Sequence, residues 1–287
     1  MENDNRKDVA LVLSSGGARG LAHIGAIEAI EAAGFHVSSI AGCSMGALVG
    51  GIYAAGKLHE FREWMKGITR RKMLELTDFS LSISHIVKGD RIIEAIMEFV
   101  PDMAIEDLPI PYCAVATDWA SGSEVVLNSG SLFEAIRASI SLPTFYKPVC
   151  RDGMILIDGG VVNPFPLNRV ARKEGDLLVG VDVSGQDYKS QSNKMHEAEE
   201  RRRKSKTLKA RILDKLIPDD IEFNYFNMLT RTSSLMIRQN SILMAQLMKP
   251  DILIDVQISQ YDTFDYDKSE KLVAIGRQFA NKAIGKA

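Results

Sequence analysis

Cysteines are few in this chain. Its 287 residues include three, Cys43, Cys113 and Cys150, and their spacing forms no paired motif. An odd set of isolated cysteines argues against a disulfide framework and against a zinc site. The sequence therefore favours a reducing compartment and a protein without a structural metal.

Long apolar runs and an excess of charge are also missing. No stretch approaches the ~18 uninterrupted apolar residues that a membrane-spanning helix needs. The segment Met1–Asp8 is polar and lacks the basic start, apolar run and cleavage site of a signal peptide. The formal net charge is −2, so nothing points to a nucleic-acid partner. We expect a cytoplasmic protein and leave peripheral contact with a bilayer open.

What is present is the composition of a globular α/β protein. Apolar residues make up 46% and charged residues 25% of the chain, enough to bury a core without covalent staples. A short apolar run, a glycine-rich turn and a helical pattern occur twice in succession, which predicts a mostly parallel sheet covered by helices. The predicted strands are 9–13, 37–41, 112–117, 124–127, 155–157, 177–183 and 252–256. The predicted helices are 21–33, one starting near 45, 132–139 and about 268–283.

The region of about 186–249 departs from this pattern, and we interpret it as an insertion between two strands of one sheet. Residues 189–215 include ten Lys or Arg but only four Asp or Glu. This basic run is either a surface for anionic lipid headgroups or a solvated charged segment. Residues 221–248 are apolar at helical spacing and rich in methionine, which suits a lid or acyl-chain wall, or equally a core or dimer-packing helix. A homo-oligomer is therefore left open.

The first chemical motif is the turn Gly42-Cys43-Ser44-Met45-Gly46. A serine flanked by glycines between a strand and a helix suits a sharp turn that exposes the hydroxyl at the end of the strand. Ser44 would also lie at a helix N-terminus, where free N–H groups such as that of Met45 favour a developing oxyanion. The alternative is a glycine-rich packing turn without chemistry. The spacing alone leaves these two readings open.

The second motif is Ser15-Gly16-Gly17-Ala18-Arg19-Gly20, directly after the first strand. Consecutive glycines allow backbone N–H groups to point at one spot, which makes a nest for an oxyanion or a phosphate. Neither glycine-rich nucleotide motif matches this spacing. Arg19 adds a positive charge for a substrate phosphate or for a carboxylate of the fold, and a simple tight turn stays open.

A serine nucleophile needs a base, and the histidines supply no convincing one. The five are His23, His36, His59, His85 and His196. His196 alone lies late in the chain, where a triad of the usual order places its histidine, but it stands inside the charged region. His23 lies on the first helix beside the glycine loop and is more simply structural. The sequence therefore disfavours a Ser-His-Asp triad.

Asp158 is the remaining candidate, in Ile157-Asp158-Gly159-Gly160 at the end of a short apolar strand. A carboxylate held there in a partly desolvated site would be a better proton acceptor than a solvated aspartate. The alternative is an ordinary Asp-Gly turn.

The three motifs, in this order, resemble the signature of patatin-like phospholipases. The resemblance also covers Leu21–Gly25, Ala138–Pro143 and Asn163–Pro166, and it extends over residues of about 8–185. One departure is Ser15, which stands where the family's loop usually has the first of three glycines.

The resemblance implies a three-layer α/β/α fold with a central mostly parallel sheet. It implies a single domain over 1–287, with a motif-bearing core of about 8–185, the insertion, and a C-terminal strand and helix in 250–287. It also implies a Ser44–Asp158 dyad without histidine, which cleaves carboxylic esters of lipids. The amides around Gly16, Gly17, Ala18 and Arg19 would hold the oxyanion. The motif glycines are Gly20, Gly42, Gly46, Gly159 and Gly160, and no metal or organic cofactor is implied.

Two other functions remain open at this stage. One is a catalytically weak protein that binds lipid and acts through recruitment. The other is acyl transfer to an acceptor other than water, which the same dyad permits. The sequence alone does not separate them from hydrolysis.

Overall fold

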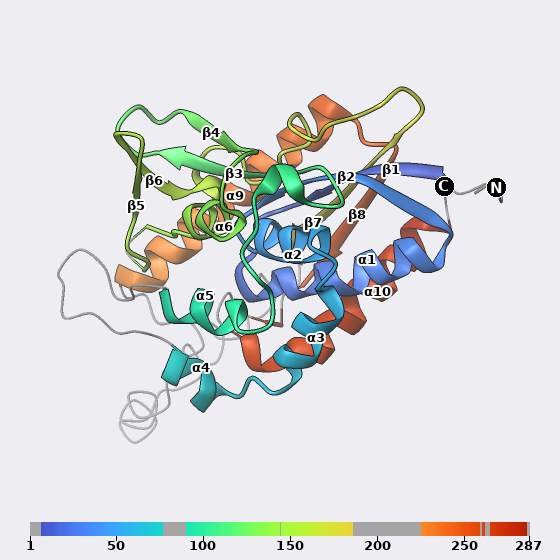
Figure 1. Ribbon diagram of the computed structural model, residues 1–287. Helices are drawn as coiled ribbons and strands as arrows, with labels where there is room; N and C mark the ends of the chain where they lie inside the picture. The colour runs from blue at the N-terminus through green and yellow to red at the C-terminus, as the bar shows by residue number, and fades with distance from the viewer. Residues whose placement is uncertain are drawn as a thin grey trace, which may run out of the picture.

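One eight-stranded sheet forms the centre of the molecule (Figure 1). The computed structural model describes residues 7–76, 90–143, 145–185, 225–258, 260–261 and 265–285. The basic run 189–215 therefore lies outside the described residues, as do His85 and His196.

Five neighbouring strands of this sheet run parallel. They are β3 (Tyr112–Asp118), β2 (Phe35–Cys43), β1 (Lys7–Leu13), β7 (Leu177–Gly185) and β8 (Ile252–Gln257). Their apolar sequences fit strands that are covered on both faces. Their carboxyl ends meet at one edge of the sheet, which is where open α/β sheets bind ligands.

The other end of the sheet is antiparallel. It consists of β4 (Glu124–Leu127), β5 (Val149–Arg151) and β6 (Met154–Asp158). The order across the whole sheet is β5-β6-β3-β2-β1-β7-β8, with β4 paired to β3. Because β6 runs against β3, its last residue returns into the sheet beside Ala116. Val115, one residue earlier on β3, pairs with Cys43 at the end of β2. This register brings the end of β6 next to the turn that follows β2.

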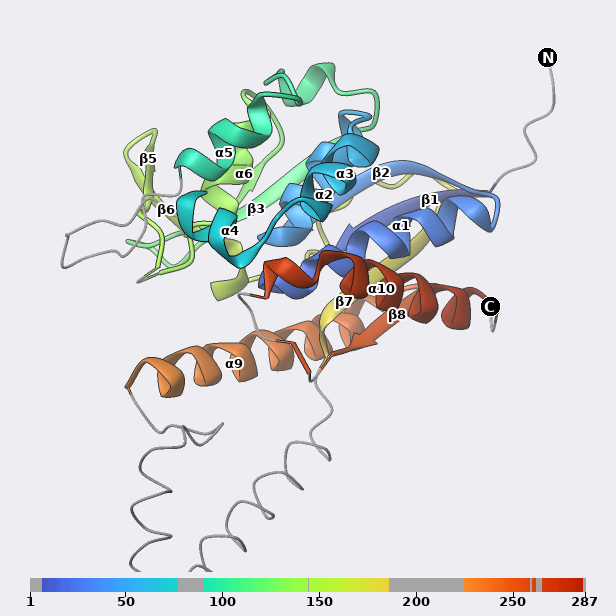
Figure 2. The same cartoon turned by 90° about the horizontal axis from the view of Figure 1, so that it is seen from below.

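Alternate residues of the parallel strands point to opposite faces. Leu11, Leu13 and Ile40 belong to the larger core, which packs against helices α1 (Ala22–Ala32), α2 (Met45–Ala54), α6 (Leu132–Ser139) and α10 (Ser269–Ile284). Val12, Ala41 and Leu178 belong to the opposite core, covered by Phe165, Leu167 and helix α9 (Tyr225–Met248). Figures 1 and 2 show α1 and α10 side by side on one face and α9 on the other. The mixed α/β class with a central, mostly parallel sheet is therefore confirmed.

Shorter elements complete the structure. The helices are α3 (Leu58–Lys66), α4 (Arg70–Leu76) and α5 (Asp90–Met97), with single turns η1 (Gly17–Leu21), η2 (Ile105–Asp107), η3 (Gly159–Val161) and η4 (Tyr266–Lys268). Helices α3, α4 and α5 and strand β5 are not predicted by the sequence pattern. The pattern does predict the other strands and helices within a few residues of their bounds.

Helix α9 connects two adjacent parallel strands, β7 and β8. Parallel neighbours need a crossover, and a helix is its usual form. The described part of the predicted insertion is thus the crossover helix of the sheet. In the described part of the chain no helix is long and apolar enough to cross a bilayer.

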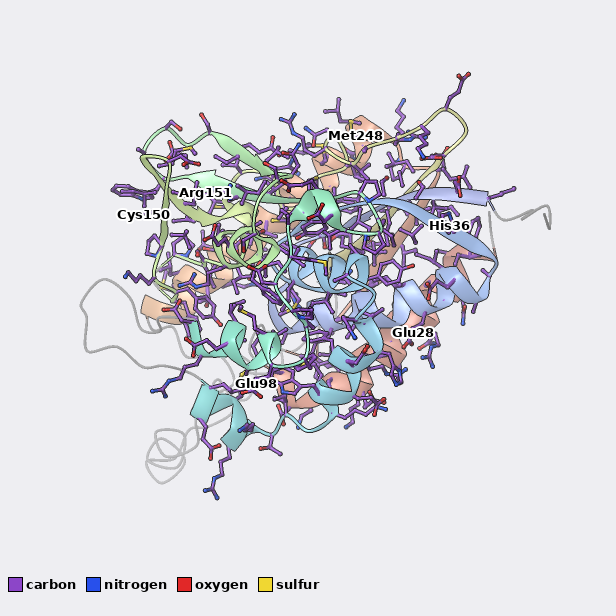
Figure 3. The ribbon with its side chains drawn as sticks, in the orientation of Figure 1. Glu28, His36, Glu98, Cys150, Arg151 and Met248 are labelled. Carbon is purple, nitrogen blue, oxygen red and sulfur yellow. The ribbon has the colours of Figure 1, made fainter. Side chains whose placement is uncertain are left out.

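The cysteines do not pair. Cys43 and Cys113 are buried, and Cys150 is exposed. Figure 3 places Cys150 and Arg151 on β5, at the outer edge of the sheet. All three are free thiols.

Candidate active site

Ser44 occupies a strained turn between β2 and α2. Its φ is 54° and its ψ is −121°, a conformation that few residues other than glycine adopt. A Cβ on Gly42 would lie 2.5 Å from the carbonyl oxygen of Gly46, and a Cβ on Gly46 would lie 2.2 Å from that of Leu13. Both glycines are therefore required by close approach of the backbone, as the spacing predicts.

The buried side chain of Ser139 stabilises this turn through hydrogen bonds. The N–H of Ser44 donates to Ser139 Oγ over 2.9 Å. The Ser139 hydroxyl in turn donates to the carbonyl oxygen of Val115 over 2.6 Å. Since Ser139 is fully buried, this relay fixes the strained backbone where water cannot replace it.

The side chain of Ser44 points at Asp158. Its hydroxyl donates to Asp158 Oδ2 over 2.6 Å, although the two residues are 114 positions apart in the chain. The pair meets because β3 separates β2 from β6 and sets both registers. Ser44 is 8% and Asp158 3% exposed, so the pair is largely shielded from water.

Backbone groups help to hold Asp158, and none of its hydrogen-bond partners within the described residues is a cation. Oδ1 accepts from the N–H of Gly160 over 2.7 Å, and the N–H of Asp158 donates to the carbonyl oxygen of Ser141 over 2.9 Å. Burial raises the pKa of the carboxyl to about 6, against the opposing effect of the bonds from Ser44 and Gly160. The group is therefore ionised near neutral pH and still basic enough to accept a proton.

No histidine takes the place of this carboxylate among the described residues, because the Ser44 hydroxyl bonds to Asp158. His23 is fully buried, and its Nε2 lies 2.9 Å from the carbonyl oxygen of Ser14. Burial lowers the pKa of His23 to about 4, so it is neutral at physiological pH. The structure thus gives His23 the structural role that its sequence position suggests.

The glycine loop lies against the Ser44 turn. Gly17 has a φ of 56° and starts η1, and a Cβ on Gly20 would lie 2.2 Å from Met45 Cγ. Ser15 has ordinary backbone geometry, because it is not among the residues with positive φ. Its N–H donates to the carbonyl oxygen of Pro164 over 2.8 Å, so this amide is already engaged.

Arg19 is buried and hydrogen-bonds to the backbone of the glycine loop. It is 7% exposed, and its Nε donates to the carbonyl oxygen of Gly16 over 3.4 Å. This bond leaves both partners predicted from the sequence, a substrate phosphate and a carboxylate of the fold, as predictions. The remaining motif glycines support the acid: Cβ atoms on Gly159 and Gly160 would lie 2.2 Å from the Val115 carbonyl oxygen and 3.0 Å from Asp158 Oδ1.

These residues open into a pocket of about 290 Å³. Gly16, Gly17, Arg19 and Met45 line it together with both members of the pair, whereas Ala18 is fully buried and not part of its lining. Most of its wall is apolar, and several of the residues that line it could not be identified from the sequence. These residues include Phe61, Trp64 and Met65 of α3, Ile92 and Ile96 of α5, and Tyr146 and Tyr266.

Comparison with known proteins decides the family. The family model described as patatin-like phospholipase matches residues 11–171, which include the glycine loop, Ser44 and Asp158.

The chain belongs to the patatin-like phospholipase family.

Curated relatives match over a similar stretch. An uncharacterized NTE family protein of Mycobacterium tuberculosis is 47% identical over 179 residues, which are 62% of this chain and 50% of that protein. Patatin-like phospholipase domain-containing protein 6 of Homo sapiens is 36% identical over 188 residues, 62% of this chain and 14% of that protein. The chain thus spans about half the length of the mycobacterial relative and far less of the human one.

A similar solved structure is the crystal structure of VipD from Legionella pneumophila. The match covers 98% of this chain and 67% of the VipD chain, with 14% sequence identity and a TM-score of 0.47.

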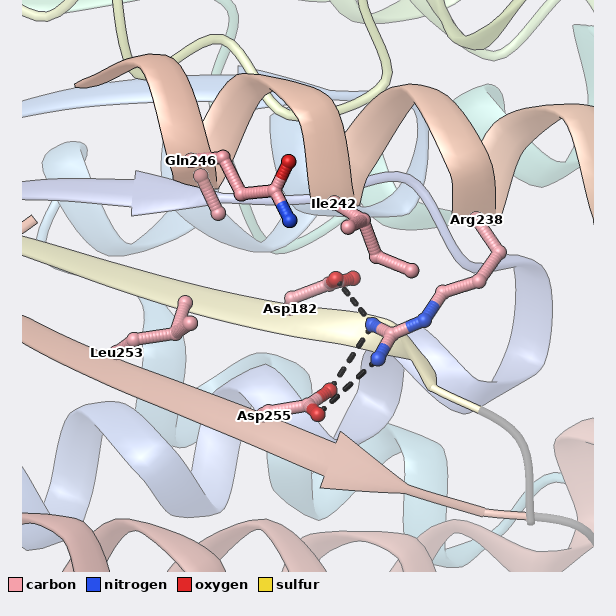
Figure 4. Close-up of a pocket in the computed structure, with 7 residues that line it drawn as sticks. Asp182, Arg238, Ile242, Gln246, Leu253 and Asp255 are labelled. Atoms are coloured by element: carbon pink, nitrogen blue, oxygen red, sulfur yellow. Dashed lines mark hydrogen bonds and ion pairs between the residues drawn. The ribbon is translucent and has the colours of Figure 1, made fainter. Parts of the chain in front are cut away.

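Helix α9 lies beyond the matched patatin-like region, yet Leu229, Thr230, Ser233, Ser234, Met236 and Ile237 line the same pocket. An ionic cluster fastens the helix to the sheet (Figure 4). Nη1 of Arg238 donates to Asp182 Oδ2 over 2.6 Å and to Asp255 Oδ1 over 2.9 Å. Because Asp182 is on β7 and Asp255 on β8, the cluster attaches the helix that forms part of the pocket wall to both strands.

Proposed function

We propose that this protein is a serine acyl hydrolase that cleaves carboxylic esters of lipids, with Ser44 as nucleophile and Asp158 as general base. The observation that carries the proposal is the 2.6 Å hydrogen bond from Ser44 Oγ to Asp158 Oδ2 in the lining of a largely apolar pocket. The family of the chain supports the same chemistry.

In the first half of the reaction Ser44 Oγ attacks the ester carbonyl carbon. Its proton passes to Asp158 Oδ2, which already accepts the hydroxyl hydrogen bond. Collapse of the tetrahedral intermediate breaks the bond to the alcohol, and the alcohol oxygen takes the proton from Asp158. The product is an acyl ester on Ser44 with a carboxylate restored beside it.

The negative oxygen of the intermediate needs donors that are in place before reaction. We assign this role to backbone amides of the loop at Gly16 and Gly17 and to the amide of Met45. Gly17 and Met45 stand at the first positions of η1 and α2, where helix amides have no partner within the helix. Ser15 is not assigned, since its amide already bonds to Pro164.

In the second half water takes the place of the alcohol. Asp158 removes a proton from the water as its oxygen attacks the acyl carbon, and the proton returns to Ser44 Oγ as the acid leaves. A base with a pKa of about 6 suits both halves, because it is ionised at neutral pH and gives up its proton readily.

The pocket supports a lipid ester over a small polar one. Rings and aliphatic side chains of α3 and α5 line the pocket, where an acyl chain would replace water at a gain of ~0.8 kcal/mol per buried methylene. We therefore expect the ratio kcat/KM to rise with acyl length until the chain fills the pocket.

Hydrolysis of p-nitrophenyl butyrate tests the proposal. Ser44→Ala should lower kcat by at least about a thousandfold, because the nucleophile is lost. The matched control is Ser129→Ala, an exposed serine of the β4–α6 loop, which should keep wild-type activity. Equal rates in Ser44→Ala and the control would contradict the proposal.

Hydrolysis and acyl transfer share the acyl-enzyme and differ in the acceptor. Product analysis in the presence of an added alcohol separates them. We expect free acid as the main product in water, and a predominant new ester at low alcohol concentration would favour transfer.

A further inference from the structure

Helix α9 carries a surface that the dyad does not use. Nine residues between 228 and 248 are exposed, and none of them is charged. Three are the neutral polar residues Thr232, Gln239 and Gln246. The other six are large and apolar and are named the α9 stripe: Met228, Leu229, Leu235, Met236, Leu243 and Leu247.

The six side chains share one side of the helix. At about 100° per residue they fall within an arc of roughly 120°, over a length of about 28 Å. The opposite side of the helix holds Arg238, Ser241 and Met244, which face the sheet or its core. A surface helix usually presents charges to water, so a long uncharged apolar stripe marks a contact surface.

The stripe continues into the mouth of the active-site pocket. Leu229 and Met236 are 37% and 60% exposed and also line that pocket. Val161 also lines the pocket at 47% exposure, and Val162 beside it is 38% exposed. These valines belong to η3 or adjoin it, and η3 contacts α9 and follows Asp158.

We propose that the α9 stripe docks on a lipid surface and holds the mouth of the pocket against it. This inference rests on the proposed function, since a lipid ester must leave a bilayer or micelle to reach Ser44. Docking through α9 would let the ester move along apolar side chains, without passing through water.

The composition of the stripe favours lipid over a second protein. Protein interfaces draw most of their affinity from Trp, Tyr and Arg, and the stripe has none of these. Leucine and methionine are flexible and uncharged, which suits a disordered hydrocarbon boundary. No acidic residue occurs anywhere in 225–248, so nothing on the helix repels phosphate headgroups.

The test is co-sedimentation of the full chain with vesicles of dialkyl-ether phosphatidylcholine, which has no cleavable ester. The variant Leu243→Gln/Leu247→Gln changes the stripe at 52% and 74% exposed positions outside the pocket. We expect at least about a tenfold loss of partitioning, since burial of one leucine is worth such a factor. The matched control Met97→Gln, 41% exposed on α5, should bind as the wild type does.

Binding should persist in 0.5 M salt, because it depends on apolar contact and not on charge. The inference is overturned if the wild type does not bind, if high salt releases it, or if the stripe variant and Met97→Gln bind equally. It is also overturned if gel filtration shows a dimer that the stripe variant dissociates. Turnover of p-nitrophenyl butyrate should be the same in wild type and stripe variant, so failure of docking is distinguishable from failure of the dyad.

Discussion

Replacing Asp158 by asparagine should abolish activity and at the same time stabilise the fold. Asparagine has the same shape, accepts from the N–H of Gly160 through Oδ1, and donates to Ser44 Oγ in place of accepting from it. Only the charge disappears. Because Asp158 is 3% exposed and bonds to neutral groups, that charge is costly in the folded state.

The pKa gives the size of the effect. The pKa of the Asp158 carboxyl rises from the ordinary 3.8 to about 6 on folding. The folded chain therefore binds the proton more tightly than the unfolded chain does. Proton binding by Asp158 therefore stabilises the fold. This contribution is complete below pH 3.8 and is lost as the pH rises through about 6. At ~1.4 kcal/mol for each tenfold in proton affinity, the carboxylate destabilises the fold by about 3 kcal/mol at pH 8 and about 1 kcal/mol at pH 4.5.

Urea unfolding followed by tryptophan fluorescence measures this difference. Asp158→Asn should exceed the wild type in free energy of unfolding by about 3 kcal/mol at pH 8, and the gain should shrink toward pH 4.5. The control Asp107→Asn, at an exposed site, should show little change at either pH. An Asp158→Asn variant that is less stable than the wild type at pH 8, or a gain independent of pH, would refute the reasoning.

Three further predictions concern the site and its supports. The kcat/KM for a soluble ester should rise about tenfold per pH unit below pH 6 and level off above it, because the reaction needs the Asp158 carboxylate; a pH-rate profile with a midpoint near 7 would indicate histidine instead. Ser139→Ala leaves the N–H of Ser44 without its acceptor. It should lower the free energy of unfolding in urea by about 1–3 kcal/mol and should lower kcat for the ester. An unchanged kcat would contradict a positioning role for Ser139. Arg238→Met leaves Asp182 buried without its counter-charge and should lower the free energy of unfolding by about 3–5 kcal/mol, as measured by denaturation. The variant Arg238→Lys keeps a positive charge and should recover part of this loss. Wild-type stability in Arg238→Met would contradict the anchoring of α9.

The strand pattern and the three motifs could be predicted from the sequence because each depends on local signals. A short apolar run that ends in glycine marks the end of β1, of β2 and of β6. Those endings identified Ser44 and Asp158 as candidates. Their contact depends on the registers of β2, β3 and β6, which no local pattern encodes.

The pocket walls could not be predicted for the same reason. Phe61, Ile96, Tyr146 and Tyr266 come from elements far apart in the chain, and each alone resembles an ordinary core residue. Helices α3 and α5 have nine and eight residues, too short for a secure pattern. The cluster of Arg238 with Asp182 and Asp255 depends on the pairing of β7 with β8, whose register places the two aspartates opposite each other.

Covalent labelling of the nucleophile tests the central claim most directly. After incubation with a fluorophosphonate probe and tryptic digestion, the wild type should carry one adduct on the peptide 20–57, with fragmentation placing it on Ser44 and not on Ser38 or Ser39. Ser44→Ala should carry none and should not turn over p-nitrophenyl butyrate. Labelling of Ser44→Ala to the wild-type extent, or ester turnover at the wild-type rate, would contradict a mechanism through Ser44.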